Sequence, residues 1–134
     1  MLLLKPDVLD AKTDEDVVRI RQKVREQATR LGFSLVDQTK IVTAASELAR
    51  NTILHGGGGT MTLEVLRQEP RTGIRLVFED HGPGIPDIGL ALTDGYTTKK
   101  GLGLGLSGSK RLMNEFEIDS RPGEGTRVRV TRWK

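Results

Sequence analysis

The chain has 134 residues, 36% hydrophobic and 29% charged, which fits one soluble globular domain (residues 1–134) and excludes a disordered chain. No apolar run could span a membrane, MLLLKPD is too short for a secretory signal, and the lack of cysteine excludes disulfides and thiol catalysis and fits the cytoplasm. A net charge of +3 with 4% aromatic residues argues against nucleic-acid binding, so Arg121, Arg127, Arg129 and Arg132 are interpreted as a solvated strand face.

Two amphipathic helices are predicted first. Thr13 and Asp16 have the spacing of a capping box, and apolar residues then recur at helical spacing until Gly32 ends the helix. Ser34 opens a second helix, which carries a second apolar line and ends at His55, before four consecutive glycines.

The remaining segments predict a sheet. Residues 60–67 and 74–79 alternate between apolar and polar side chains, and the QEPRTG sequence between them has turn composition, so they predict a hairpin. A helix is expected over about 107–116, and EIDSRPGEGTRVRVTRW closes the chain as two strands around a PGEG turn. The expected fold class is α+β: a two-layer sandwich with a mixed, mostly antiparallel sheet and helices on one face.

A glycine-rich stretch, GLGLGLSG, precedes the last predicted helix. Gly103, Gly105 and Gly108 match the spacing of a dinucleotide-binding loop, but no strand precedes them and the lysine of a Walker loop is absent. What remains is exposed backbone N–H groups before a helix N-terminus, where an anion is stabilised. The stretch by itself is equally consistent with a phosphate site and with a flexible loop.

Two further groups of polar residues could complete such a site. Glu47 and Asn51 are four residues apart and therefore share a helix face, beside the predicted buried stripe. An asparagine oxygen suits Mg²⁺ and a carboxylate can take a proton from a hydroxyl, although a solvated surface pair is the alternative. Asp80 ends a predicted strand before Gly82 and Gly84, where it either accepts from an exocyclic amine or caps the turn.

Three short motifs in one order then resemble a known family. ELARN, DHGPGI and GLGLGL are similar to the N, G1 and G2 boxes of the GHKL ATPases, which include gyrase B, Hsp90, histidine kinases and MutL and share the Bergerat ATP-binding fold. EDHGPGIPDI, KRLMNEF and GEGT extend the likeness over nearly the whole chain to the small anti-sigma regulatory serine/threonine kinases, and most to RsbT-type switch kinases.

The resemblance implies a role for each motif. Glu47 would be the general base and Asn51 the Mg²⁺ ligand, while Asp80 would accept from the adenine amino group of ATP, with Gly82 and Gly84 shaping its turn.

Two later segments would complete the nucleotide site. The resemblance implies that Gly101, Gly103 and Gly105 wrap the phosphates, and that Thr126 approaches the adenine through water.

The same resemblance implies a function. The chain would transfer the γ-phosphate of ATP to a serine or threonine of a STAS-domain antagonist. Once released, it would bind and activate a PP2C-type phosphatase in a partner-switching stress pathway, with a stressosome scaffold as a further partner. The alternative is an anti-sigma factor that sequesters a sigma factor directly and phosphorylates its antagonist.

Overall fold

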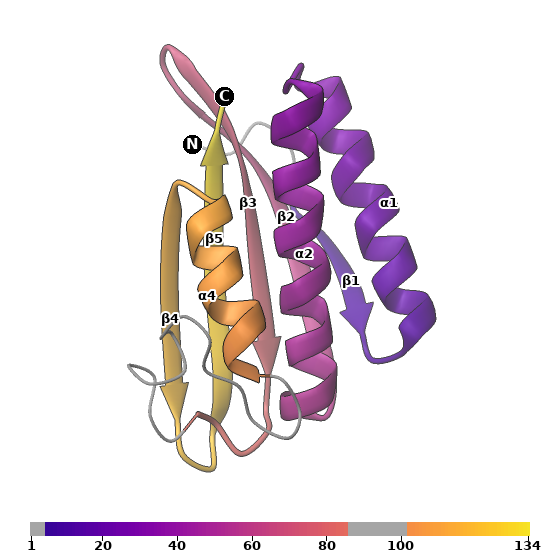
Figure 1. The fold of residues 1–134 in the computed structure, drawn as a ribbon, viewed down its shortest axis with the longest axis vertical. Helices are drawn as coiled ribbons and strands as arrows, with labels where there is room; N and C mark the ends of the chain where they lie inside the picture. Colours follow the sequence, from indigo (N-terminus) through magenta and orange to yellow (C-terminus); the bar gives the residue numbers. More distant parts are fainter. Residues whose placement is uncertain (1–4, 86–101) are drawn as a thin grey trace.

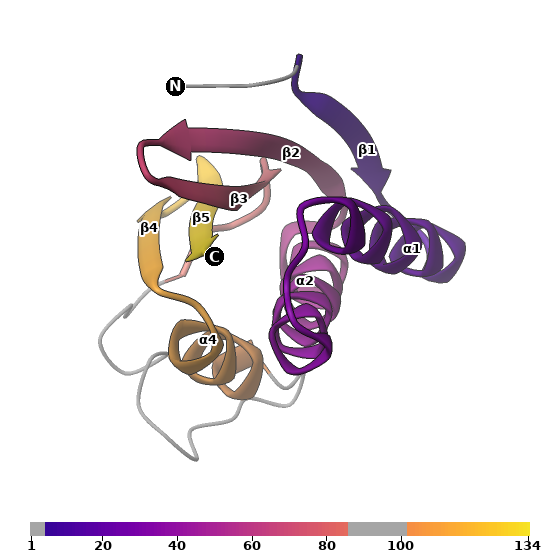
Figure 2. The same ribbon diagram turned by 90° about the horizontal axis from the view of Figure 1, so that it is seen from above.

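The structure is a computed structural model, and it describes residues 5–85 and 102–134. In chain order the elements are β1 (Asp7–Ala11), α1 (Asp14–Arg30), α2 (Leu35–Gly56), β2 (Gly59–Gln68), β3 (Arg71–Asp80), α4 (Leu102–Leu112), β4 (Glu115–Arg121) and β5 (Gly125–Trp133). The strands form one sheet in the order β1-β2-β3-β5-β4. Figures 1 and 2 show the three helices on one face of that sheet, which confirms the predicted two-layer α+β fold.

The first two helices begin where their sequences predict. The Thr13 side chain accepts the backbone N–H of Asp16, whose carboxylate accepts the N–H of Thr13 in return, so the capping box is complete. Ser34 caps α2 by accepting the N–H of Asp37. Gly57 ends α2 in the left-handed conformation, with φ of 74°.

The sheet and the helices share one apolar core. β2 and β3 pair along their whole length, so Met61 lies opposite Phe78 and Leu63 opposite Leu76, all buried under the helices. On α2, Ile41, Ala45 and Leu48 are also at most 1% exposed. The small alanines of α2 allow it to pack against both α1 and α4 while it covers the sheet.

Three sequence expectations need correction. The short edge strand β1, which pairs with β2, was not predicted. A mixed sheet was expected, but each of the four strand pairings in the described residues is antiparallel. Helix α4 begins at Leu102 and ends at Leu112, rather than running over about 107–116, and Phe116 belongs to β4.

The four C-terminal arginines do not form an open basic patch. Each has a carboxylate within 4.0 Å: Arg121 with Asp119, Arg127 with Glu79, Arg129 with Glu117 and Arg132 with Asp37. Charges already paired within the protein attract phosphates weakly. The solvated-strand interpretation fits the exposed Arg121 and Arg127 but is wrong for Arg132, whose side chain is only 17% exposed and is bonded to Asp37 of α2. Within the described ranges, no helix is both long and apolar enough to cross a membrane.

Candidate functional site

A small cavity lies between α2, the sheet and α4. It measures about 20 Å³, enough for one water molecule. Its lining combines apolar and polar side chains: Leu48, Asn51, Thr52, His55, Phe78, Asp80, Gly84, Ile85, Leu106, Thr126 and Val128. Four predicted site residues, Asn51, Asp80, Gly84 and Thr126, therefore converge here from four separate segments.

Asp80 sits at the end of β3 in a cradle of glycines. Its Oδ1 accepts the N–H of Gly82 at 2.9 Å, so the turn-capping interpretation of this carboxylate is correct for one oxygen. The other oxygen, Oδ2, lies over Gly56 of α2, where a Cβ would come within 2.4 Å of it. A Cβ on Gly82 would in turn meet the Gly56 backbone at 2.7 Å. The carboxylate reaches the cavity because these two backbones lack side chains.

Asn51 presents an amide whose hydrogen bonding is incomplete. Its Nδ2 atom is buried and has no hydrogen-bond partner among the described residues. A buried polar atom without a partner costs about 1–3 kcal/mol, so such atoms in a cavity indicate a place for a ligand or water. Rotating the amide by half a turn would place its oxygen at the same point, as a hard cation requires.

Glu47 lies one helical turn before Asn51 but does not line the cavity. Its side chain is half-buried, whereas Leu48 and Thr52, which follow Glu47 and Asn51 by one position, are 1% and 5% exposed. The predicted placement of the pair at the border of the buried stripe is therefore correct. The catalytic role of Glu47 and the ligand role of Asn51 stay predictions.

Thr126 belongs to a hydroxyl network that the sequence did not reveal. Its Oγ1 lies 2.7 Å from the Oγ of Ser120 on the paired strand β4. The same Ser120 Oγ accepts the N–H of Ile85 at 2.7 Å. Ser120 thus joins the turn after β3 to the hydroxyl that faces the cavity.

The glycine stretch differs from its predicted form. Gly103 and Gly105 lie within the first two turns of α4, so the loop expected at these two positions ahead of the helix is wrong. Their contact with the phosphates stays a prediction. Gly101 lies outside the described residues. The predicted juxtaposition of this stretch with a helix N-terminus remains, because α4 begins at Leu102.

Two histidines flank the site differently. His55, to which the sequence assigned no role, lines the cavity from the last turn of α2. His81 is exposed and lines a separate surface depression beside Glu79 and Arg121.

The donor set fits a nucleotide together with Mg²⁺ better than a metal alone. Among the described residues, no group of three or more His, Cys, Asp or Glu side chains is placed to hold a metal ion. Mg²⁺ usually takes one or two protein oxygens and completes its shell with water and substrate phosphates, a role that one asparagine can fill. The glycine cradle at Asp80 and the unpaired Asn51 amide provide the space and polarity for such a ligand.

Comparison with known proteins places these features in a family. Residues 36–134 match the model described as histidine kinase-, DNA gyrase B-, and HSP90-like ATPase. The serine/threonine-protein kinase RsbT of Bacillus subtilis is 47% identical over 90% of this chain and 91% of its own. The anti-sigma F factor of a Thermoanaerobacter species is 32% identical over 84% of this chain and 82% of its own. The mycobacterial sensor histidine kinase MprB shares the fold, with a TM-score of 0.56 and 20% identity over 96% of this chain and 97% of that structure.

Proposed function

We propose a function that proceeds from one premise: the chain belongs to the family of histidine kinase-, DNA gyrase B- and HSP90-like ATPases. Within that family it is an ATP-dependent protein serine/threonine kinase of the RsbT and anti-sigma F type, as the similarity to these two relatives over 90% and 84% of the chain indicates. Three points go beyond that similarity: the place where Mg-ATP binds, the protein that accepts the phosphate, and the consequence of the transfer.

Mg-ATP binds, in this proposal, at the cavity between α2, α4 and the ends of β3 and β5. The observation that carries it is the convergence of Asn51, Asp80, Gly84 and Thr126 on one polar-lined space. Because that space is only about 20 Å³, the adenine enters by widening it, and Leu48, Phe78 and Val128 then supply apolar walls. Asp80 Oδ2 accepts from the exocyclic amine, while Oδ1 keeps its bond to Gly82.

ATP supplies the phosphoryl group, and Mg²⁺ offsets the charge of its phosphates. Asn51, in the last two turns of α2, would offer its amide oxygen to the metal. Glu47, one turn earlier on the same helix, takes the proton from the hydroxyl of the acceptor protein. The N-terminus of α4, with the backbone of Gly103 and Gly105, lies on the phosphate side and favours negative charge there.

The acceptor, in this proposal, is a serine or threonine of a STAS-domain antagonist in the cytoplasm. A phosphate carries nearly two negative charges, and placing it in a packed interface adds repulsion and desolvation cost, so transfer releases the kinase. The freed kinase then binds and activates a PP2C-type phosphatase, with a stressosome scaffold as a further partner. The alternative, direct capture of a sigma factor, is supported only by the less similar relatives, at 32% identity against 47%.

A release experiment tests this switch. The chain and the antagonist from the same cell are mixed, Mg-ATP is added, and the complex is followed by size-exclusion chromatography. Wild type is expected to form the complex and leave it as phosphate appears on the antagonist. The Glu47→Ala variant is expected to form the complex and remain in it. Release of that variant at the wild-type rate, without phosphate on the antagonist, would show that phosphorylation does not drive the switch.

A further inference from the structure

An open groove runs along the outer side of the helix pair, away from the nucleotide cavity. It measures about 520 Å³ and is lined by Val18, Arg21, Gln22, Arg25 and Glu26 of α1 and by Val42 of α2. The α1 residues recur every three or four positions, so they form one continuous face. We define these six residues as the α1–α2 groove.

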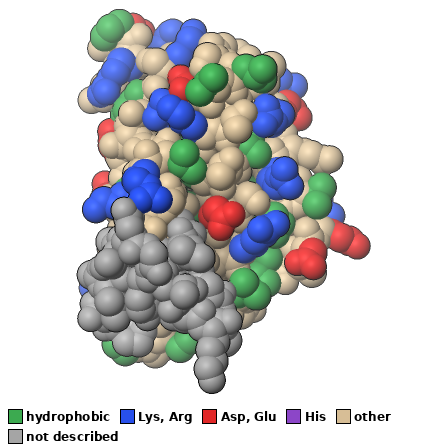
Figure 3. Space-filling model, in the orientation of Figure 1, with side chains coloured by type: hydrophobic (Ala, Val, Ile, Leu, Met, Phe, Trp, Pro, Cys, Tyr) green, Lys and Arg blue, Asp and Glu red, His purple; other side chains and the backbone are tan. Residues whose placement is uncertain are grey.

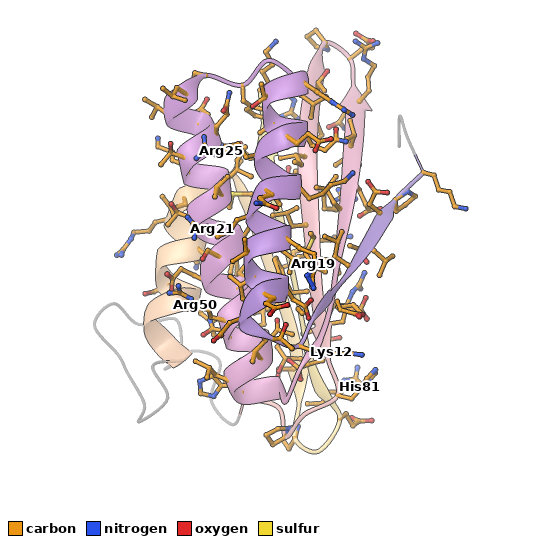
Figure 4. All side chains as sticks on the ribbon, turned by 90° about the vertical axis from the view of Figure 1, so that its right-hand side faces the viewer. Lys12, Arg19, Arg21, Arg25, Arg50 and His81 are labelled. Atoms are coloured by element: carbon orange, nitrogen blue, oxygen red, sulfur yellow. The ribbon has the colours of Figure 1, made fainter. Side chains whose placement is uncertain are left out.

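The groove combines an apolar floor with exposed arginines. Val18 is 50% exposed, which is high for a valine beside a packed helix interface, and Val42, which also lines the groove, is 6% exposed. Arg21 and Arg25 stand one helical turn apart along the edge. Figure 4 shows Arg25, Arg21 and then Arg50 of α2 following one another down the same side of the helix pair.

These arginines differ from the other basic residues of α1 in having no carboxylate partner in the described part of the chain. Arg19 lies 3.5 Å from Asp16, Lys23 lies 3.3 Å from Asp7, and Arg30 lies 3.2 Å from Glu26. Because Arg30 already offsets the charge of Glu26, that carboxylate does not neutralise the groove.

By contrast, Arg25 makes only a long hydrogen bond, at 3.4 Å, to the uncharged side chain of Gln38. Arg21 and Arg50 form no ion pair or hydrogen bond with any described residue. Among the described residues that line the groove, Glu26 is the one carboxylate, and it is paired with Arg30, so the groove carries a net positive charge.

The groove shares helix α2 with the proposed general base. Val42 and Glu47 lie on the same helix, five residues and therefore about 7.5 Å apart along its axis. Arg50 follows Glu47 within one further turn. A protein segment that runs from Arg25 towards Arg50 therefore extends along α2 past the level of the proposed general base.

We propose that the α1–α2 groove docks an acidic amphipathic helix of the phosphoacceptor protein. Carboxylates four residues apart on a helix have the same spacing as Arg21 and Arg25, and an apolar residue between them would cover Val18. Figure 3 shows basic and hydrophobic side chains interspersed over this helical face, with fewer acidic ones, which suits an acidic partner surface. This inference rests on the proposed function, since the occupant is its substrate.

The test compares Arg21→Gln/Arg25→Gln with a matched control, Arg19→Gln, which removes a paired arginine from the same helix outside the groove lining. Phosphorylation of the purified STAS-domain antagonist is followed at saturating Mg-ATP. Two lost ion pairs at an exposed interface are expected to raise KM for the antagonist about two- to thirtyfold, with kcat little changed. ATP affinity, measured by calorimetry, stays at the wild-type value because the groove lies outside the cavity. The control is expected to match wild type throughout.

The outcomes separate the two proposals. If wild type phosphorylates the antagonist and the double variant keeps the wild-type KM, the groove is not the docking site. If wild type neither binds nor phosphorylates the antagonist, the proposed function fails and the groove loses its assigned occupant. Binding of the chain to phosphatidylserine vesicles that is lost in the double variant would overturn the proposal in favour of a lipid surface. A concentration-dependent dimer that the double variant abolishes would overturn it in favour of a second copy of the chain.

Discussion

Gly56, in the last turn of α2, lies directly beneath the carboxylate of Asp80 at the end of β3. A Cβ built on Gly56 would come within 2.2 Å of the Asp80 Cγ, a distance that no packed pair tolerates. The helix and the strand therefore approach each other closely because one of them carries no side chain. The orientation of the proposed adenine acceptor depends on this contact.

Substitution of Gly56 tests the contact. Glycine to alanine inside a helix normally stabilises it by about 1 kcal/mol, but here the clash with Asp80 reverses the sign. We expect Gly56→Ala to lower the free energy of unfolding by about 1–3 kcal/mol and to weaken ATP binding. Gly108→Ala is the control, because Gly108 lies in α4 and, among the described residues outside its own helix backbone, no atom comes within 4 Å of its Cβ position, so the change should be stabilising. Chemical denaturation measures the free energy of unfolding of both variants. If the two substitutions change it equally, the close contact between Gly56 and Asp80 would be contradicted.

Asp80→Asn tests the acceptor itself. Asparagine can retain the bond to the N–H of Gly82 while replacing Oδ2 by a donor. A donor facing the adenine amine is expected to weaken Mg-ATP binding about tenfold to a hundredfold. Calorimetry measures the affinity, and a thermal unfolding curve close to wild type excludes misfolding as the cause. Unchanged ATP affinity would remove Asp80 from the site.

Ser120 is expected to support the site through its hydroxyl. Ser120→Ala leaves the N–H of Ile85 without its partner and frees the Thr126 hydroxyl to rotate. The expected cost is about 1–3 kcal/mol of unfolding free energy, with weaker ATP binding. Ser120→Thr keeps the hydroxyl and should recover most of the affinity. If Ser120→Ala lost stability but bound ATP as wild type does, the network would be structural only.

Acid stability is expected to depend on the α1 capping box. The backbone N–H of Lys12, bonded to the Asp16 carboxylate at 3.0 Å, lowers the pKa of that group below its ordinary value of 3.8. A lowered pKa in the folded state stabilises the fold above pH 3.8, and this contribution is lost as the pH falls through the folded-state pKa.

The matched variants are Asp16→Asn, which removes the titrating group, and Asp14→Asn in the same helical turn. Helical content is followed by circular dichroism during acid titration. It should depend less steeply on pH in Asp16→Asn than in wild type, and as steeply as in wild type in Asp14→Asn. The same pH dependence in both variants would contradict this role of Asp16.

The sequence predicted the features whose causes are local. Thr13 and Ser34 cap helices through bonds within three residues, so the starts of α1 and α2 could be read directly. The start of α4 could not, because glycine disfavours helices by about 1 kcal/mol per residue and packing against α2 overrides that preference. Strand β1 is five residues long and depends on its pairing with β2.

In the candidate site, too, the features set by local sequence could be predicted and those set by distant residues could not. The spacing of Glu47 and Asn51 follows from helix geometry, and both lie where that geometry predicts. Gly56 and Ser120 were missed because each acts on a residue distant in the chain, Asp80 or Ile85. In the sequence, the four consecutive glycines indicate only the end of a helix. Nothing near them in the chain indicates that Asp80 packs against the first of them, Gly56.

The central claim is that Glu47 drives phosphoryl transfer to a protein hydroxyl while contributing little to ATP binding. Removing a positioned general base should lower the rate by about 10²–10⁴. Thr43→Ala, an exposed change one turn earlier on α2, is the matched control and should retain the wild-type rate.

The most direct measurement is single-turnover transfer from γ-labelled ATP to the purified antagonist by wild type, Glu47→Ala and Thr43→Ala, with ATP affinity determined in parallel. The account predicts labelled antagonist with wild type and Thr43→Ala, and a rate lower by about 10²–10⁴ with Glu47→Ala at nearly unchanged ATP affinity. Transfer by Glu47→Ala at the wild-type rate would contradict it.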